Sequence, residues 1–156
     1  MELDTLLTNN ESSVLDEAFT GLQRSHVAHY EAAGEDYTRA RLATLFELVV
    51  AAISTRNLAE VSAYSEAVAA ERFSQGFDIS EVQTAYNALE EAMWRCLLAE
   101  ESIADLPEAI GLLSTVIGFG KDALARKYVS LACERRVPSL DLTALFAGTA
   151  TSSLAD

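Results

Sequence analysis

The sequence predicts an all-α protein, and three observations support this. Half of its 156 residues are apolar, while only seven are Gly and two are Pro, a composition typical of a folded domain with few loops. Apolar residues recur at spacings of three and four over long stretches, which is the period of one helix face. Both Pro residues, Pro107 and Pro138, lie near predicted helix ends, where Pro is tolerated. A chain of this length buries a sizeable core without disulfides or metals.

Five main helices are predicted, beginning with two in the first third of the chain. Ser12 or Ser13 can cap the first helix, whose apolar face runs towards Tyr30. After the break at AAGED, the second helix extends over about residues 35–56. Its middle, LATLFELVVAAI, is apolar on nearly all sides, which predicts a helix in the centre of the domain, covered by others.

The stretch ERFSQGFDISEVQTAYNALEEAMW, residues 71–94, predicts a helical hairpin. Asn57 can cap the third helix, which ends at Gly76, a residue suited to the left-handed conformation of a helix C-terminus. Asp78 with Glu81 then forms a capping box that begins the fourth helix. Apolar residues follow along one narrow face of this helix: Ile79, Val82, Tyr86, Leu89, Met93 and Cys96.

Asp105 and Glu108 repeat the capping pattern for a fifth helix that extends to about Arg136. Unbroken, it would be about 45 Å long, so we expect Gly118 and Gly120 to kink or split it. DLTALFAG after Pro138 predicts a short C-terminal helix. The predicted organisation is one helical domain over residues 1–138, followed by the short helix and a flexible tail over 139–156.

The chain is acidic, with a net charge of −13 and a pI near 4.4. This charge disfavours nucleic acid and anionic membrane surfaces as partners. Residues 121–136 are the exception, with five Lys or Arg against two acidic residues. Those cations either stabilise the C-terminal end of the helix by interacting with its dipole or form a docking face for an acidic protein. Arg135 and Arg136 are the contact candidates of that docking face. We find no signal peptide and no apolar stretch that could span a membrane, and expect a cytoplasmic protein.

No constellation of catalytic or metal-binding residues is evident. GFGKD, residues 118–122, lacks the first Gly and the Ser or Thr of a phosphate loop. His26 and His29 are the only histidines and lie on one predicted helix, which leaves no later His to complete a metal site or bind haem. Cys96 and Cys133 lack metal or redox spacing and are predicted to be buried thiols. We expect no enzyme activity, no metal and no cofactor.

Two features have alternative interpretations. Trp94 and Leu98 project away from the apolar seam of the fourth helix, so they form either a second packing surface within the domain or a subunit interface. Arg72 falls on the apolar side of the third helix, where a cation needs a partner. A structural ion pair is the first interpretation, and contact with the carboxylate of a ligand is the second.

The hairpin resembles the N-terminal domain family of the RsbR and RsbRD proteins, the RsbT co-antagonists of bacterial stress signalling. The likeness lies in Arg72 and Gly76, in the turn over 77–80, and in a following helix with Glu81, Tyr86 and Leu89. The resemblance covers about residues 12–136. It implies a globin-like helical bundle that binds no haem, forms homodimers and serves as the sensory input to an attached STAS output domain. The residues after the last long helix are too few for a STAS domain, so we expect either a free-standing version or the input half of a longer protein.

The favoured function is a non-enzymatic regulatory or sensory domain of bacterial stress signalling. It would act by dimerisation and by repacking of helices around the 71–94 hairpin, and its partner would be a signalling protein or an attached output domain. The alternative is a globin-like protein that binds a small molecule or a cofactor of the haem or bilin type. Its pocket would then include residues of the third and fourth helices: Tyr64, Arg72, Tyr86, Met93 and Cys96.

Overall fold

The computed structural model describes residues 2–101 and 103–136. Over these residues the protein is all helical, without strands, and has seven helices. Their bounds are α1 Leu3–Asn9, α2 Glu11–Arg24, α3 Ala28–Ala33, α4 Glu35–Thr55, α5 Ala59–Ser74, α6 Ile79–Ala99 and α7 Leu106–Arg136. No helix in the described part is both long and apolar enough to cross a lipid bilayer.

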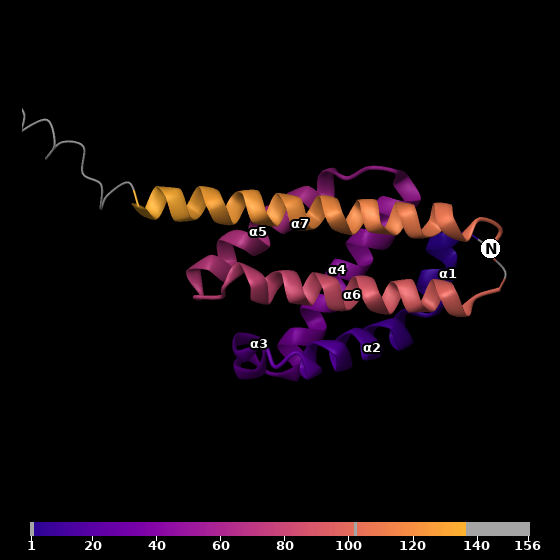
Figure 1. Cartoon of the computed structure of the whole chain (residues 1–156), viewed down its shortest axis with the longest axis horizontal. Coiled ribbons are helices and arrows are strands. Elements are labelled where there is room, and N and C mark those ends of the chain that lie inside the picture. The colour runs from indigo at the N-terminus through magenta and orange to yellow at the C-terminus, as the bar shows by residue number, and fades with distance from the viewer. Residues whose placement is uncertain (1, 102, 137–156) are drawn as a thin grey trace, which may run out of the picture.

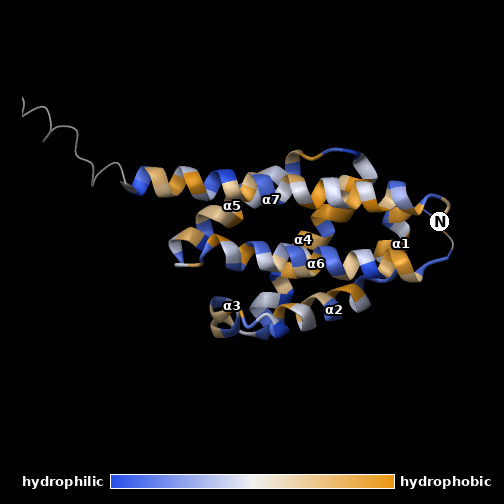
Figure 2. Ribbon diagram, in the orientation of Figure 1, coloured by the Kyte–Doolittle hydropathy of each residue, from blue (hydrophilic) through white to orange (hydrophobic). Residues whose placement is uncertain are grey.

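Helix α4 is the centre of the bundle, as its apolar middle predicts. It contacts all six other helices, and it crosses behind the pair formed by α6 and α7 (Figure 1). Around it, α5 packs against α7, and α2 packs against α6. Figure 2 shows hydrophobic and hydrophilic residues interleaved along α6 and α7, as expected for helices that bury one face and expose the other.

The prediction of one long first helix is wrong. The chain forms two helices there, α2 and α3, because it turns after α2 at His26, whose φ of 50° is left-handed, and continues through Val27 in an extended conformation. Helix α1 was not predicted, although it buries Leu6 and Leu7 completely. The N-cap of α2 is Asn10, so the predicted serine cap is also wrong.

The predicted turn between α5 and α6 is confirmed, although α5 packs mainly against α7. Gly76 has a φ of 84°, the left-handed conformation that ends α5. Both halves of the capping box between Asp78 and Glu81 are present at the start of α6. The N-cap of α5 is Leu58 and not the predicted Asn57, whose side chain accepts a hydrogen bond of 2.9 Å from the Ala59 amide just before the helix.

The prediction that α7 kinks or splits is wrong, since it is one helix of 31 residues. A Cβ at Gly120 would lie 3.1 Å from Ser65 Oγ and from Val61 Cγ1, and 3.3 Å from Tyr86 Cε2. Gly120 therefore allows α7 to approach α5 and α6 closely and does not interrupt the helix. The predicted short helix and tail over 139–156 lie outside the described residues, so that part of the predicted domain organisation stays a prediction.

Candidate functional site

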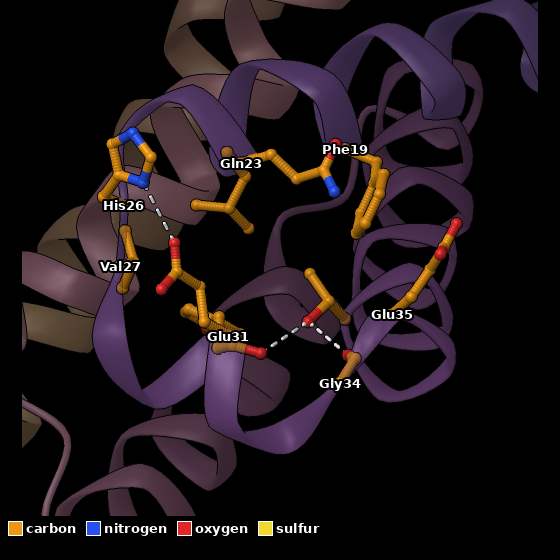
Figure 3. A pocket seen from close by; sticks show the side chains of 10 residues that line it. Phe19, Gln23, His26, Val27, Glu31, Gly34 and Glu35 are labelled. Atoms are coloured by element: carbon orange, nitrogen blue, oxygen red, sulfur yellow. Dashed lines mark hydrogen bonds and ion pairs between the residues drawn. The ribbon is translucent and has the colours of Figure 1, made fainter.

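An open pocket of about 400 Å³ lies at the corner where α2, α3 and α4 meet (Figure 3). Phe19, Leu22 and Val27 supply apolar surface on one side. At its edge, His26 Nδ1 lies 3.2 Å from Glu31 Oε1, and both side chains are largely exposed. We call this space the outer pocket. Its full lining is Phe19, Leu22, Gln23, His26, Val27, Tyr30, Glu31, Gly34, Glu35 and Thr38.

Two chain reversals hold α3 against α4 and so shape the outer pocket. The left-handed His26 precedes α3, and Gly34, with a φ of 97°, follows it. The Thr38 hydroxyl of α4 lies 2.9 Å from the Gly34 carbonyl oxygen and 3.4 Å from that of Tyr30 (Figure 3). These contacts fix the position of Tyr30, which forms the inner wall of the pocket.

A second, much smaller space of about 20 Å³ lies behind that wall. It shares Leu22, Tyr30 and Thr38 with the outer pocket, and we call it the inner cavity. A space of this size holds about one water-sized particle. Its full lining is Leu22, Tyr30, Thr38, Arg41, Leu42, Leu45, Tyr64, Val68, Arg72, Ala85 and Tyr86.

Arg72 is the main charged group of the inner cavity and is only 1% exposed. Its Nη1 lies 2.7 Å from Glu71 Oε1, so the ion pair expected from the sequence is present. The guanidinium carbon also lies 5.1 Å from the ring centre of Tyr37 and 5.4 Å from that of Phe77, within cation–π range. Burial alone would lower the pKa of Arg72, but its contacts, with Tyr30 foremost, leave that pKa above its ordinary value. Arg72 is therefore a permanent buried cation.

Arg41 brings a second guanidinium to the same place. Its Nη2 lies 3.4 Å from the same Glu71 Oε1 that Arg72 contacts, and its carbon lies 5.0 Å from the Tyr37 ring centre. Two cations thus share one carboxylate. The Nε atoms of Arg41 and Arg72 are both buried and have no hydrogen-bond partner among the described residues, an arrangement that is rare because an unpaired buried donor is costly.

The tyrosines around the inner cavity are neutral. Burial raises the pKa of Tyr30 and of Tyr64 above the ordinary value, and the Arg72 guanidinium offsets only part of this rise. Burial also raises the pKa of Tyr86, whose hydroxyl lies 2.9 Å from Ser65 Oγ. All three side chains keep their protons at neutral pH, so each has an O–H group that can donate a hydrogen bond.

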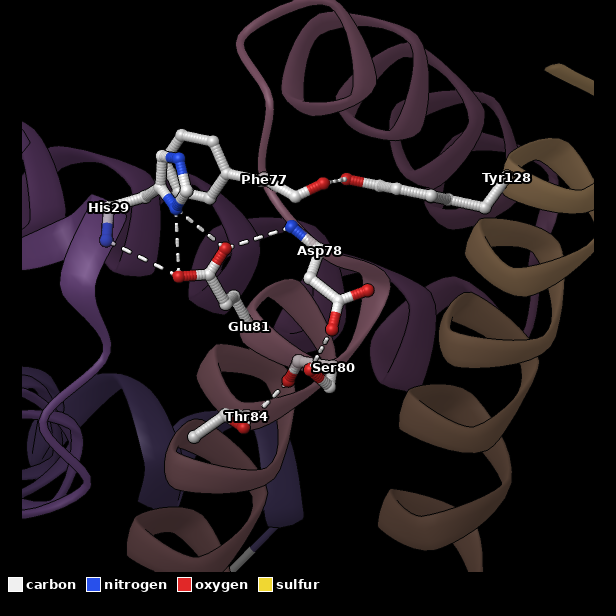
Figure 4. A network of polar contacts seen from close by, with 7 residues as sticks. All are labelled: His29, Phe77, Asp78, Ser80, Glu81, Thr84 and Tyr128. Atoms are coloured by element: carbon white, nitrogen blue, oxygen red, sulfur yellow. Dashed lines mark hydrogen bonds and ion pairs between the residues drawn. The ribbon is translucent and has the colours of Figure 1, made fainter. Parts of the chain in front are cut away.

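A polar network connects α3 to the start of α6 (Figure 4). His29 Nδ1 lies 2.9 Å from Glu81 Oε1 and 2.8 Å from Oε2, and the His29 amide lies 3.3 Å from Oε1. Glu81 Oε2 also accepts the Asp78 amide at 2.8 Å. Burial alone would raise the pKa of Glu81, but the hydrogen bonds from His29 and Asp78 lower it below its usual range. Glu81 therefore ties α3, next to Tyr30, to the hairpin turn.

The same turn is tied to α7. The Tyr128 hydroxyl donates a hydrogen bond of 3.3 Å to the Phe77 carbonyl oxygen (Figure 4). Tyr128 also meets the Phe73 ring edge-on at 5.8 Å between centres, and the Arg135 guanidinium lies 5.6 Å from the Phe73 ring centre. Mainly through burial, the pKa of Tyr128 rises to about 12. The hairpin turn thus contacts α3 on one side and the C-terminal part of α7 on the other.

The structure brings together some of the pocket residues predicted from sequence and separates others. Tyr64, Arg72 and Tyr86 line the inner cavity. Met93 is fully buried but does not line that cavity, and Cys96 is half-buried at a separate pocket between α2 and α6. Cys133 is exposed, so its prediction as a buried thiol is wrong: the far end of α7 has a solvent-facing side.

Sequence reasoning missed Tyr30, Thr38 and Arg41 at the site. Arg41 adjoins the apolar middle of α4, and no local pattern distinguishes it from an ordinary surface cation. The predicted contact residues Trp94 and Leu98 are 40% and 49% exposed on α6. Arg135 is exposed, and the side chain of Arg136 lies outside those described. Across the described ranges, no group of three or more His, Cys, Asp or Glu could hold a metal ion.

These features define an all-helical bundle with a small cavity lined by two arginines and a hairpin turn that contacts both α3 and α7. A family model described as "RsbT co-antagonist protein rsbRD N-terminal domain" matches residues 13–136, from α2 to the end of α7. The chain belongs to this family and is a regulatory domain of stressosome-type signalling, which confirms the resemblance seen in the hairpin. Comparison with curated proteins found no match, and comparison with solved structures found none.

Proposed function

We propose that this chain is a non-enzymatic, globin-like input domain that forms homodimers and regulates a signalling protein or an attached output domain. Its output is a change in helix packing, and family membership over residues 13–136 supports the regulatory role. A ligand or partner that favours one of two packings shifts their populations according to its difference in affinity for them.

The observation that carries this proposal is the pair of contacts at the hairpin turn. Glu81 binds His29 of α3, and four residues earlier the Phe77 carbonyl oxygen binds Tyr128 of α7. A shift of α3 at the pocket therefore reaches α7 through one short, capped turn. Small shifts of packed helices of this kind are a common element of switching transitions.

Hydrogen exchange tests this connection. Glu81→Gln weakens the link between α3 and the turn, so we expect faster amide exchange in α7 between residues 128 and 136. Glu31→Gln is the matched control, since Glu31 also pairs with a histidine but lies at the exposed edge of the outer pocket. Unchanged exchange in α7 of the Glu81→Gln protein contradicts the proposed route.

The proposed dimer surface lies on α6. Trp94 and Leu98 are one turn apart and are large exposed apolar residues, and aromatic anchors of this kind are enriched at interfaces. The basic end of α7, with Arg135 and Arg136, is the proposed contact for an acidic partner.

Light scattering over a range of protein concentrations tests the dimer. We expect a dimer for the unaltered chain and a monomer for Trp94→Ala. Trp94 is the only Trp, so its fluorescence emission should also shift to the blue on association. Val129→Ala is the control, since Val129 is an exposed apolar residue on α7. If Trp94→Ala leaves association intact, the surface is wrong.

Small-molecule binding is the second candidate function, and the outer pocket favours it. Its volume of about 400 Å³ falls within the range of ordinary ligand pockets, and its inner wall borders the inner cavity, which Arg72 lines. A visible absorption spectrum of the purified chain tests for a haem or bilin occupant, because either would give strong bands. A colourless protein contradicts a haem or bilin ligand.

A further inference from the structure

We propose that the inner cavity is a binding site for a single monatomic anion of the size of chloride. The proposal concerns the buried space behind Tyr30 and not the outer pocket. It does not depend on the signalling role, because the charge, the donors and the volume of the cavity carry it without reference to an output.

The charge of the site is the first argument. Arg41 and Arg72 share a single carboxylate, that of Glu71, so the pair leaves one positive charge without a counter-charge. The described residues that line the cavity include no acidic side chain. The nearby acids are engaged elsewhere: Glu81 with His29, Glu31 with His26, and Glu35 with Arg39. Arg72 is buried, whereas the Arg41 side chain is 41% exposed, so water screens part of the excess charge and a bound anion would neutralise the rest.

The hydrogen-bond donors are the second argument. The Nε–H groups of Arg41 and Arg72 are buried without acceptors, and both residues line the cavity. The Tyr30, Tyr64 and Tyr86 side chains line it as well and stay protonated, since burial raises the pKa of each. Because the Tyr86 hydroxyl already lies 2.9 Å from Ser65 Oγ, the two Nε–H groups are the main donors, which suits an anion because an anion only accepts hydrogen bonds.

The volume of the cavity selects among anions. About 20 Å³ holds one water-sized particle, which favours a monatomic anion over phosphate, sulfate or the carboxylate of an organic acid. A water molecule fits the space and could accept from both Nε–H groups, but it would leave the excess positive charge in place. Charge and size together favour a halide ion.

Thermal unfolding of the full chain at constant ionic strength is the first test. The sodium salts of chloride, bromide and gluconate have the same cation, and gluconate is too large for the cavity. We expect a saturable rise in Tm with chloride or bromide, about 3 °C at tenfold the dissociation constant. Equal Tm values in all three salts overturn the proposal.

A matched pair of variants shows where the anion acts. Arg41 is half-exposed, so Arg41→Gln should fold, and we expect it to lose the halide-dependent rise in Tm. Arg39→Gln is the control, because Arg39 is on the same helix but pairs with Asp16 and Glu35 outside the cavity. It should keep the full rise. An Arg41→Gln protein that responds to chloride as the unaltered chain does overturns the proposal.

Anomalous diffraction from crystals grown in bromide observes the occupant directly. We expect an anomalous peak between the guanidinium groups of Arg41 and Arg72. A water molecule there without anomalous signal, or an empty cavity, overturns the proposal, whatever the stability measurements show.

Discussion

The core has two sides that meet at Tyr86, and they are built very differently. On the side of α7 the packing is tight: a Cβ at Gly120 would lie only 3.1 Å from Ser65 and Val61, and Lys121 Nζ has two partners, Asn87 Oδ1 at 2.9 Å and Glu90 Oε2 at 3.1 Å. On the side of α4 there is a cavity, and Arg72 is buried with an unpaired Nε. Lys121 thus has two polar partners, whereas Arg72 has an unpaired Nε beside its ion pair with Glu71.

This difference indicates what the unsatisfied side is for. A bundle that packs a glycine against two helices is able to fill its core, and replacing a whole buried ion pair by well-packed apolar residues often costs no stability. Retaining Arg72 beside a cavity therefore favours a binding role for its charge. Three predictions follow from this difference. The first separates the charge of Arg72 from its volume, and the second compares the tightly packed Gly120 with the loosely packed Gly118. The third compares Glu81, which ties α3 to the hairpin turn, with Glu31 at the exposed edge of the outer pocket.

Substitution of Arg72 should have the largest effect on stability, and two variants separate the contribution of its volume from that of its charge. Arg72→Ala removes a large side chain that is 1% exposed, so we expect it to lower the free energy of unfolding by about 3 kcal/mol. Arg72→Met keeps the volume without the charge and should change stability by no more than about 1 kcal/mol in either direction. Urea unfolding followed by circular dichroism measures both. If Arg72→Met lowers the free energy of unfolding as much as Arg72→Ala does, the charge of Arg72 itself stabilises the fold. The proposed contrast between the two sides of the core would then be wrong.

Gly120 and Gly118 should respond with opposite signs. Gly120→Ala places a methyl group 3.1 Å from Ser65 and Val61, so we expect a net loss of about 1 kcal/mol after the gain in helix propensity. A Cβ at Gly118 meets nothing within 4 Å, and Gly118→Ala should stabilise by about 0.5–1 kcal/mol. Thermal unfolding compares the two. A stabilised Gly120→Ala protein would mean that the α7 side is not tightly packed.

Glu81 should show a smaller effect that depends on pH. Its pKa is lowered in the folded protein, so its contribution is present above the ordinary pKa of about 4.5 and is lost as pH falls through the lower folded value. At pH 7 we expect Glu81→Gln to cost about 1 kcal/mol. Measured against the unaltered chain, this deficit should shrink below about pH 4.5.

Glu31→Gln serves as the reference for that measurement. Glu31 and His26 are both exposed, so we expect its cost to stay under about 0.5 kcal/mol at every pH. A deficit for Glu81→Gln that stays constant down to pH 3 would show that the carboxylate charge contributes nothing. The contacts of Glu81 would then contribute no more to stability than the exposed His26–Glu31 pair at the edge of the outer pocket.

The parts of the fold that depend on local chemistry could be predicted from the sequence. The stop at Gly76 and the capping box at Asp78 involve residues within a few positions of each other, and both are present. The break at His26 could not be predicted, because a left-handed His has no local signature. The role of Gly120 also depends on side chains of two other helices, which the order of residues along α7 does not reveal.

The site could be predicted only in part, for the same reason. Arg72 was detectable because a cation on an apolar helix face is conspicuous. Its sharing of Glu71 with Arg41, 31 residues earlier along the chain, is a tertiary contact. The outer pocket arises from the reversal between α2 and α3, which the prediction of one continuous helix had removed. An error in a helix boundary thus hid a pocket.

The unbroken α7 has a mechanical consequence. Its C-terminal end extends beyond the rest of the bundle (Figure 1), so a rigid tilt of the helix about the close contact at Gly120 would also shift Tyr128 and Arg135 against the α5–α6 hairpin. For a rod of this length, with 1.5 Å per residue, tilting about that point by about 5° moves the tip by about 2 Å. The displacement of the C-terminal end is therefore proportional to the tilt angle of α7 at Gly120. A kink in the helix would have reduced this displacement.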